Sequence, residues 1–355
     1  MTGSPQRLSG APGTGWVLGV DSGGSGVRVA LARADGSGTT APAVSDRPAP
    51  VGERGIEAAS LLGLLLPLAE RLMREAGAPR ISAACVGAAG MASLGDDLRA
   101  RLPAALSDAL GVTELALAGD AVTAYAGALG LRPGVVVAAG TGMIALGTGG
   151  DGQGWRRADG WGHLLGDDGG GAWIGRAGLA AAVRAHDGRA GGSGPLLARA
   201  RALFGPVEKL PGQLYPRPDR PAVLASFAPE VAACAAQDPV AAGILRRAAA
   251  HILESAAAVR PAAGPVDVAF TGGLFKMGEP LLAPLREQAA RLLPEAALVP
   301  AAGDPLDGAV LIAGALHGGR LTLPTDPALL SLIRSSRLVR SGSSGQPRPA
   351  TERDR

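Results

Sequence analysis

Two segments of the chain repeat one pattern, in which a glycine-rich turn separates two short apolar runs. The runs and their turn cover residues 16–20, 27–32 and 21–26 in the first segment, and 135–139, 143–148 and 140–142 in the second. Short apolar runs bounded by glycine are typical of β-strands, so each segment predicts a β-hairpin. The repetition indicates a weak internal duplication with a period far longer than that of a solenoid.

Helical and strand patterns alternate after each hairpin. Apolar residues recur at helical spacing in residues 56–76, which predicts a helix there. Further helices are predicted at 96–110, 120–131, 171–186, 195–204, 221–236, 238–260, 278–293 and 307–317, and further strands at 39–44, 81–87, 114–118, 153–158 and 266–271. This order predicts an α/β fold with two similar halves facing each other across a cleft, into which each half points its glycine-rich turn.

The chain is long enough for two domains of about 150 residues each. The hairpin pattern restarts after residue 131, so we place an N-terminal domain at 15–131 and a second domain at 132–304. Residues 1–14 are expected to form a flexible leader. Residues 319–355 are expected to form a tail that is disordered from about residue 335, where Ser, Gly, Pro and Arg predominate.

The net charge of +3 and the isoelectric point near 9.3 describe mainly the ends of the chain. Six arginines but only two acidic residues lie in residues 331–355, so the charges of the rest nearly balance. Aromatic residues make up only 3% of the chain, which leaves no surface on which nucleic-acid bases could stack. We therefore expect no nucleic-acid partner.

Two cysteines, Cys85 and Cys234, lie far apart in apolar or alanine-rich segments. This spacing predicts buried, reduced thiols rather than a disulfide framework. Residues 133–150 are uncharged but rich in glycine, which favours strands and turns over a membrane helix. The N-terminus lacks the basic and apolar pattern of a signal peptide, so we expect a cytoplasmic protein with no membrane partner.

Lysine is the rarest charged residue, with only Lys209 and Lys276 in the sequence. Neither lies in the glycine-rich pattern of a Walker A loop or in the pattern of a protein kinase. Residues 167–171 contain three glycines but do not follow an apolar strand, which argues against a Rossmann nucleotide site. A phosphate group would therefore have to be bound by backbone N–H groups and a metal ion.

The turn at residues 21–26 has the composition for that task. Its glycines let the backbone approach a ligand, and successive N–H groups can form an anion-binding nest. Ser22 and Ser25 add hydroxyl donors, and Asp21 at the strand end could hold a hydrated Mg²⁺ ion. The turn at 140–142 offers a second site of this kind, although each turn alone could be an ordinary hairpin turn.

Three further segments have the pattern of a ligand site. Asp120 lies between a predicted strand and a predicted helix, where it could be a helix cap or a general base. Residues 160–171 contain six glycines, an entropic cost that is most plausible where backbone approaches a ligand. Residues 271–273 again end a strand with glycines. His163 lies in the glycine-rich segment and its role stays open, whereas the other three histidines are interpreted as structural or surface residues.

Five motifs in this order resemble one known family. They are Asp21-x-Gly-Gly-Ser-x-x-Arg28, Gly119-Asp120-Ala121, Ala139-Gly140-Thr141-Gly142, the segment from Gly160-Trp161-Gly162-His163 to Gly166-Asp167-Asp168-Gly169, and Thr271-Gly272-Gly273. Together they are similar to the N-acetylglucosamine kinase branch of the sugar kinase/Hsp70/actin superfamily, also called BadF/BadG-type ATPases. The resemblance covers about residues 15–318. It implies two RNase-H-like domains of the actin/hexokinase type that close on ATP, Mg²⁺ and an amino sugar.

The resemblance also implies roles for individual residues. Asp21 would position Mg²⁺ through water, and Asp120 would accept the proton of the sugar 6-hydroxyl. The helix at 305–318 would complete the first domain and act as a hinge. The implied ATP phosphate contacts are Ser22, Gly23, Gly24, Ser25, Gly140, Thr141 and Gly142, the implied adenosine contacts are Thr271, Gly272 and Gly273, and the implied sugar contacts are Asp120, Gly160, Trp161 and Asp167.

The sequence departs from the family pattern in three places, which bear mainly on the acceptor. Arg47 stands where the family usually has a sugar-binding Asn, Met143 follows the second phosphate turn in place of Ser, and residues 88–90 lack the usual Ser hydroxyls. Buried hydrogen-bond partners strongly determine polar specificity. Arg47 would suit an acidic or oxygen-rich acceptor, or could be an exposed surface residue. N-acetylglucosamine is therefore the first expected acceptor, with glucosamine, N-acetylmuramic acid and a cyclitol as alternatives.

Two other functions of the same superfamily remain open. An activator-type ATPase would couple hydrolysis to electron transfer through an iron–sulfur cluster shared by a dimer, which requires well-placed cysteines from each subunit. Cys85 and Cys234 are poorly placed for that role. A non-catalytic sugar sensor would have no need for Asp120 as a base. A homodimer is possible for the kinase as well.

Overall fold

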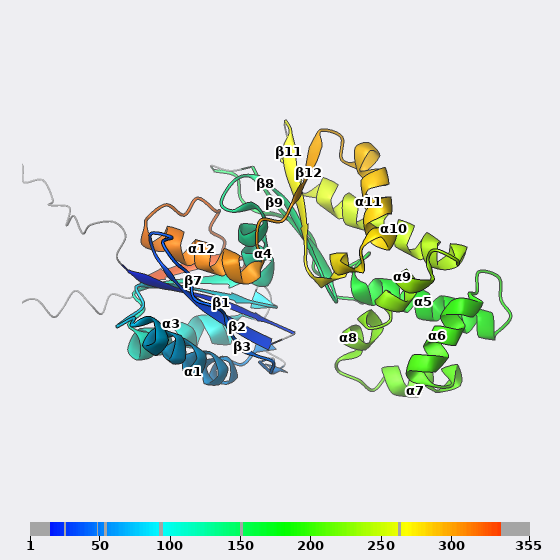
Figure 1. Ribbon diagram of the computed structural model, residues 1–355, viewed down its shortest axis with the longest axis horizontal. Helices are drawn as coiled ribbons and strands as arrows, with labels where there is room; N and C mark the ends of the chain where they lie inside the picture. Colours follow the sequence, from blue (N-terminus) through cyan, green and yellow to red (C-terminus); the bar gives the residue numbers. More distant parts are fainter. Residues whose placement is uncertain are drawn as a thin grey trace, which may run out of the picture.

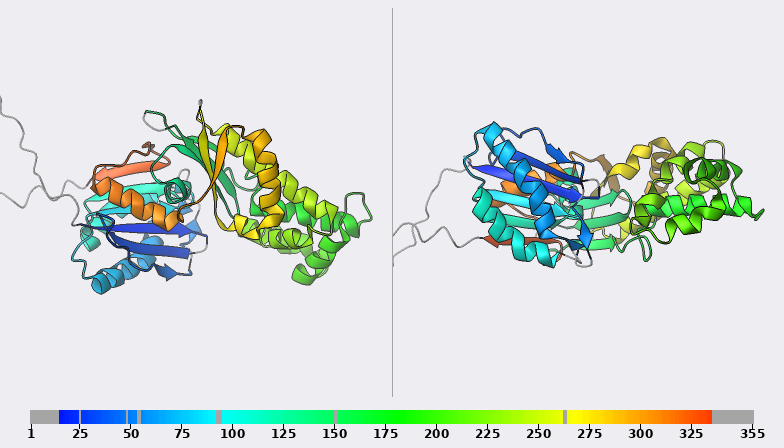
Figure 2. Two further views of the ribbon diagram at one scale, coloured as in Figure 1. Left: turned by 45° about the horizontal axis from the view of Figure 1, so that its top comes forward. Right: turned by 90° about the horizontal axis from the view of Figure 1, so that it is seen from below.

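The computed structural model has two lobes, each built around one β-sheet (Figure 1). It describes residues 15–24, 26–47, 49–52, 55–91, 95–149, 152–261 and 264–334. The predicted leader at 1–14 and the predicted disordered tail from 335 onward lie outside these residues. Two further views show the same separation of the lobes (Figure 2).

The first lobe contains a six-stranded sheet in the order β13-β7-β6-β1-β2-β3. Its strands are β1 (Trp16–Gly23), β2 (Gly26–Arg33), β3 (Ala43–Ser45), β6 (Ala83–Ala88), β7 (Glu114–Gly119) and β13 (Leu330–Arg334), and a separate short pair consists of β4 (Val51–Gly52) and β5 (Gly55–Ile56). β1, β2 and β3 are successively antiparallel, whereas β6 and β7 run parallel to β1. β13 returns late in the chain to pair with the outer edge of β7.

Helices cover both faces of this sheet. α1 (Ala58–Ala76) and α3 (Asp96–Leu110) share a leucine-rich core with one face. α12 (Pro305–His317) covers the other face, and α4 (Asp120–Leu129) packs against α12, between this sheet and the second lobe. They approach closely because Gly127 and Gly308 have no side chains, and a Cβ atom at either position would collide with neighbouring backbone.

The second lobe repeats the arrangement with five strands in the order β10-β9-β8-β11-β12. Its strands are β8 (Gly134–Ala139), β9 (Met143–Thr148), β10 (Arg156–Asp159), β11 (Val266–Thr271) and β12 (Ala296–Pro300). β8, β9 and β10 are successively antiparallel, whereas β11 and β12 run parallel to β8. Both lobes therefore contain a hairpin, a third antiparallel strand and two parallel strands, which confirms the predicted α/β fold of two similar halves.

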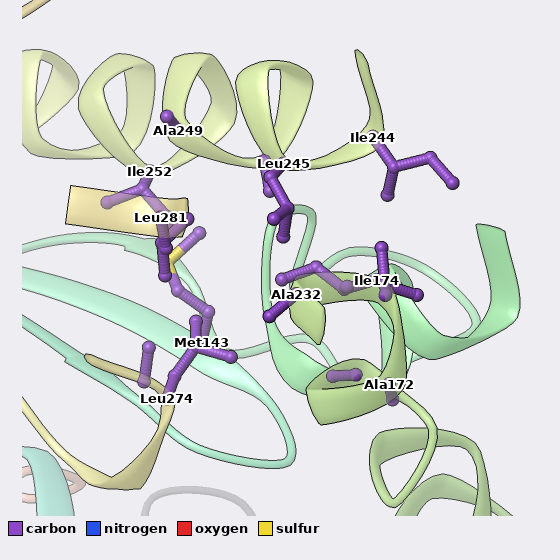
Figure 3. Packing of buried hydrophobic residues seen from close by; sticks show 14 of the residues in the cluster. Met143, Ala172, Ile174, Ala232, Ile244, Leu245, Ala249, Ile252, Leu274 and Leu281 are labelled. Atoms are coloured by element: carbon purple, nitrogen blue, oxygen red, sulfur yellow. The ribbon is translucent and has the colours of Figure 1, made fainter. Parts of the chain in front are cut away.

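The helices of the second lobe build one large core. They are α5 (Gly171–His186), α6 (Gly194–Phe204), η1 (Val207–Lys209), α7 (Leu210–Leu214), α8 (Arg220–Ala225), α9 (Ala228–Cys234), α10 (Pro239–Ala258), η2 (Gly273–Met277) and α11 (Glu279–Leu292). Figure 3 shows Met143, Leu274, Leu281 and Ile252 converging in this core from β9, η2, α11 and α10. Side chains of a strand alternate between the two faces of the sheet. Val136 on β8 therefore points to the face opposite this core, where it packs with α4. The two glycine-rich turns of this lobe are thus anchored in one apolar cluster.

Two predicted elements are wrong in their extent, since the strand predicted at 39–44 covers only Ala43–Ser45 and one predicted helix is divided. The sequence predicts a single helix at 221–236, but α8 ends at Ala225 and α9 begins at Ala228. Pro229 lies in the first turn of α9, and it has no N–H that could continue the helix from α8. The pattern also misses the short elements β4, β5, η1, α7 and η2 and the strands β12 and β13. The domain boundaries inferred from the sequence stay predictions.

Two smaller features bear on the protein class. Cys85 and Cys234 are both buried free thiols, as predicted, and burial raises the pKa of Cys85 well above its ordinary value. Within the described part of the chain, none of the helices combines the length and the apolar character needed to cross a membrane.

Candidate active site

The first part of the site lies at the edge of the sheet where β1, β6 and β7 end. Asp21 is in register with Gly87, and one position further along β6 Ala88 is in register with Gly119. Asp120 follows directly as the first residue of α4. Because parallel strands end at the same edge of a sheet, Asp21 and Asp120 become neighbours. Figure 1 shows α4 between the two lobes.

The carboxyl group of Asp120 is surrounded by protein and still reached by water. Its Oδ1 atom accepts a 2.9 Å hydrogen bond from the backbone N–H of Ala121, and the side chain is exposed. The surrounding protein removes part of its hydration and raises its pKa, and the negative charge of Asp21 raises it further. A raised pKa makes the ionised carboxylate a better proton acceptor, which suits a general base.

An arginine that the sequence analysis left without a role fixes Asp21. Arg28 on β2 donates from Nη2 and Nε to the Oδ2 atom of Asp21, at 2.6 and 3.1 Å. Its Nη1 atom donates at 2.6 Å to the Oδ2 atom of Asp304, which is the N-cap of α12. Burial alone would raise the pKa of Asp304, but hydrogen bonds from Arg28 and from the backbone of Asp307 hold that pKa below its ordinary value.

The first glycine-rich turn is open where the resemblance expects phosphate. A Cβ atom at Gly23 or Gly24 would meet no other atom within 4 Å. The side chain of Ser22 is fully buried, and its hydroxyl has no hydrogen-bond partner among the described residues. Ser25 lies outside the described residues. Gly26 has φ +130°, and a side chain there would strike the carbonyl of Ser45, so this position requires glycine.

The second turn is tied to the start of α5. The N–H groups of Gly171 and Ala172 donate to the carbonyl oxygens of Gly140 and Thr141, at 2.9 and 2.8 Å. Gly140 and Thr141 are exposed, and a Cβ atom at Gly140 would meet no atom within 4 Å. The turn therefore presents accessible backbone while its carbonyl groups are satisfied.

The candidate adenosine residues lie directly beside the second turn. Thr271 is in register with Ala138 across β11 and β8. Gly272 has φ +106°, and any side chain there would collide with the backbone of Ala139. A Cβ atom at Gly273 would meet open space. The structure thus brings residues 140–142 and 271–273 together, although the sequence separates them widely.

Asp167 holds the glycine-rich loop in a strained but well-bonded conformation. It is buried, has φ +59°, and accepts a 3.1 Å hydrogen bond at Oδ1 from the N–H of Gly162. Burial raises the pKa of Asp167. Its own N–H donates at 2.8 Å to Oδ1 of Asp159, whose Oδ2 accepts a 2.5 Å hydrogen bond from the hydroxyl of Ser255 on α10. Asp159 also has a positive φ of 61°. Backbone strain of this kind clusters at functional sites.

The sequence analysis missed Asp159 and Ser255 as parts of the site. Asp159 stands immediately before Gly160, and an acidic residue at the start of a glycine-rich loop is a signal that could have found it. Ser255 lies in an alanine-rich helix and gives no such signal.

The other residues of the same loop remain exposed. The side chain of Trp161 is 64% exposed, and the guanidinium of Arg157 lies 4.2 Å from its ring centroid. Gly160 has φ +74° and is also exposed. The ring of His163 is half-buried, and its Nε2 atom has no partner among the described residues. An exposed indole can stack against the apolar face of a sugar.

Arg47 lies on the first lobe, apart from this loop. It is exposed and follows the edge strand β3 by two residues. The carbonyl of Ser45 packs against Gly26, so Arg47 lies near the first turn along the chain. The other histidines, His186, His251 and His317, each lie within 4 Å of a glutamate, which fits a structural or surface role. In the parts of the chain that the structure describes, His, Cys, Asp and Glu form no cluster of three that could hold a metal ion.

Known proteins share this architecture. Among solved structures, the chain is similar to a candidate N-acetylglucosamine kinase from Chromobacterium violaceum, with 30% identity, a TM-score of 0.65, and coverage of 84% of this chain and 98% of that chain. It is also similar to a ROK family glucokinase from Streptomyces griseus, solved with glucose and AMPPNP, with 20% identity, a TM-score of 0.55, and coverage of 85% and 99% of the two chains. A similarity at 20% sequence identity shows the fold alone.

A curated relative matches a shorter part of the chain. An N-acetylmuramic acid/N-acetylglucosamine kinase from Clostridium acetobutylicum is 41% identical over 70 residues, which cover 20% of this chain. The match spans only about a fifth of that relative, or 22% of its length. The profile of the BadF/BadG/BcrA/BcrD ATPase family matches residues 18–313, which include every motif of the site. The chain therefore belongs to the BadF/BadG/BcrA/BcrD ATPase family.

Proposed function

We propose that this protein is an ATP-dependent kinase that phosphorylates an amino sugar, N-acetylglucosamine first among the candidates, at its 6-hydroxyl. The placement of Asp120 carries the proposal. Its carboxylate has a raised pKa, is reached by water, and starts the helix that lies between the two lobes. The similar solved structures and the curated relative include sugar kinases, which supports the same reaction class.

Backbone groups would bind the nucleotide in this proposal. The open glycines of the two turns would donate N–H groups to the phosphates, and residues 271–273 would border the adenosine. Phosphoryl transfer depends mostly on positioning and on charge stabilisation, so lysine is not required.

The residues present fit Mg²⁺ held through water. Arg28 engages only the Oδ2 atom of Asp21, and Oδ1 has no hydrogen bond within the described ranges. The ion would neutralise charge on the ATP phosphates when it is bound. Asp21 would orient its water shell.

Residues of the glycine-rich loop would bind the acceptor. Trp161 offers an exposed ring, Gly160 an exposed backbone, and Asp167 a buried carboxyl group held by Gly162. Asp120 would accept the proton of the attacking hydroxyl as the oxygen bonds to the γ-phosphorus. Glucosamine, N-acetylmuramic acid and a cyclitol remain alternative acceptors.

A coupled ADP-release assay across amino sugars, neutral hexoses and cyclitols tests this proposal. We expect release of ADP to require an amino sugar, with N-acetylglucosamine giving the highest kcat/KM. Phosphorus NMR of the product then identifies the phosphorylated hydroxyl. ADP release that proceeds equally without any acceptor would contradict the kinase reaction.

Replacing Ser255 tests how the acceptor loop is held. Ser255→Ala removes the hydrogen bond to Asp159 and leaves one oxygen of this half-buried carboxylate without that donor. We expect the KM for the amino sugar to rise by about tenfold, which corresponds to the loss of one hydrogen bond to a charged group. The KM for ATP should stay unchanged. The matched control is Ser60→Ala. Ser60 lies on α1, and its hydroxyl donates an exposed hydrogen bond to Glu57. Equal changes in both variants would exclude a specific role for Ser255.

Arg47→Asn tests whether Arg47 reaches the acceptor. We expect the preference between N-acetylglucosamine and a carboxylate-bearing amino sugar to change more than the KM for ATP, because a guanidinium favours a carboxylate through a bidentate ion pair. The measurement is the ratio of kcat/KM for the two sugars. An unchanged ratio would place Arg47 on the surface, outside the acceptor site.

Iron content tests the alternative of an activator-type ATPase. Both cysteines are buried, in different lobes, and desolvation raises the pKa of Cys85, which disfavours cluster ligation by a thiolate. We expect protein purified without oxygen to contain no iron and to have no visible absorbance. A stoichiometric iron–sulfur cluster would overturn the kinase proposal.

A further inference from the structure

A cavity of about 760 Å³ lies in the second lobe, apart from the two phosphate turns. One face of α5 forms its floor, η1, α7 and α8 form its walls, and residues 163–164 of the glycine-rich loop form part of its rim. Cavities that bind small organic ligands have volumes of about 300–1,000 Å³. Its size therefore fits a ligand of that class.

The walls of the cavity are apolar, but its charges are mostly positive. Leu179, Val183, Leu210 and Leu214 supply apolar surface. Four arginines line it against two acidic residues, Asp187 and Glu208.

The positive charges of these arginines are largely free. Among the described residues, the side chains of Arg184 and Arg220 donate only to backbone carbonyl oxygens, so their charges are not neutralised. Arg176 and Arg189 are exposed, and their side chains have no hydrogen-bond or ion-pair partner in the described part of the chain. The cavity thus combines an apolar interior with an excess of cationic groups, which is complementary to an organic anion with an apolar body.

The rim of the cavity belongs to the proposed acceptor loop. His163 and Leu164 line the cavity, while Trp161 and Asp167 lie two to four residues away in the same loop. Leu164 is 77% exposed, and the Nε2 atom of His163 is buried without a partner from the described residues. An unsatisfied buried nitrogen favours any movement that supplies a partner. The loop therefore has a physical reason to change conformation when the cavity is filled.

We propose that this cavity is an effector site for a small amphipathic anion, and that its occupancy changes the affinity of the acceptor loop for the amino sugar. Binding in the cavity does not depend on the proposed function. The effect on the acceptor rests on that function, because it requires residues 160–167 to bind the sugar.

Fluorescence titration with 8-anilinonaphthalene-1-sulfonate, an amphipathic anion, tests binding in the cavity. Ala180 lines the cavity on α5 and is exposed, so the indole of Ala180→Trp would occupy part of it. We expect this variant to raise the Kd of the probe by about tenfold or more, equivalent to 1.4 kcal/mol. Ala290→Trp, at an exposed alanine of α11, is the matched control and should leave the Kd unchanged.

A second pair of variants tests the role of charge. Arg176→Gln should weaken probe binding, whereas Arg246→Gln, at an exposed arginine of α10, should not. Equal affinity in wild type, Ala180→Trp and Arg176→Gln would overturn the effector site. Full displacement of the probe by AMPPNP with Mg²⁺ would also overturn it, because the probe would then occupy the nucleotide site.

The coupling is tested by repeating the titration with saturating N-acetylglucosamine. Linkage requires that the sugar and the probe change each other's affinity by the same factor, and we expect at least about a threefold change. Probe binding that the sugar leaves unchanged would disprove the coupling. If calorimetry detects no binding of the sugar, the proposed acceptor is wrong. The comparison of probe binding by Ala180→Trp and Ala290→Trp then still decides whether the cavity binds the anion.

Discussion

The Asp120→Asn variant should lose sugar phosphorylation almost completely while it still binds ATP. A positioned general base contributes about 10²–10⁴-fold to a rate, and asparagine cannot accept the proton. We therefore expect kcat in the coupled ADP-release assay to fall by about that factor. The Kd for ATP, measured by calorimetry, should stay unchanged because the proposed phosphate contacts are the glycine turns and not Asp120. Near-normal turnover would eliminate Asp120 as the base.

The same variant should be more stable to heat at neutral pH. Desolvation raises the pKa of Asp120 in the folded protein, so the ionised form is less favourable there than in the unfolded chain. This penalty is present above the folded pKa and disappears as the pH falls below the unfolded pKa. The amide of the Asp120→Asn variant carries no charge, so Tm should rise near pH 7 and change little in acid. In the wild type, kcat should fall as the pH drops through the raised pKa of Asp120.

A control separates this effect from a general effect of removing an acid at a helix start. Asp96 is the first residue of α3. Its side chain is exposed to solvent, and it lies outside the candidate site. Asp96→Asn should therefore leave kcat unchanged and should not raise Tm. If both variants lose activity equally, the loss reflects damage to folding and says nothing about proton transfer.

The Arg28→Met variant should require a higher concentration of Mg²⁺ for the reaction. It removes the common partner of Asp21 and Asp304 and leaves both carboxylates without their ion pair. Loss of a residue that orients a metal-binding group typically costs about 10–100-fold in metal affinity or activity. We expect the Mg²⁺ concentration for half-maximal rate to rise by about this factor. The measurement is a Mg²⁺ titration of the initial rate at saturating ATP and sugar.

Two further variants identify the cause of that loss. Arg33 lies on the same strand, and its guanidinium lies 4.1 Å from the centroid of the Trp16 ring. Arg33→Met should leave the Mg²⁺ dependence of the rate unchanged. Arg28→Lys keeps the charge but lacks the planar fork that bridges two carboxylates. It should give an intermediate result. A normal Mg²⁺ titration for Arg28→Met would show that Asp21 does not need its partner.

Hydrophobic periodicity predicts most of the fold because the strands and helices here are strongly apolar on their buried sides. α3 and α5 occupy the predicted ranges, and both hairpins form where the glycine-rich turns predict them. The pattern fails for β12, whose burial does not alternate, and for β13, which is a short edge strand. It also fails at Pro229, where a local proline effect outweighs continuous apolar spacing.

The arrangement of the candidate site was predictable where a residue lies in a motif, and not where it depends on tertiary contacts. Asp21 and Asp120 end or follow strands, so parallel topology brings them together. Ser255 comes from the middle of α10 and has no local signature. Asp304 is recognisable as a helix cap, but its hydrogen bond to Arg28 joins residues 276 positions apart and follows only from the three-dimensional fold.

The exchange of helices between the two lobes has a consequence for independent folding. α12 follows a strand of the second sheet but packs on β1 and β6 of the first. α4 follows a strand of the first sheet but packs on β8 of the second. One face of each sheet is therefore buried by a helix that follows a strand of the other sheet. A fragment ending near residue 131 would expose apolar β-surface to water, so the duplicated halves fold as an obligate pair.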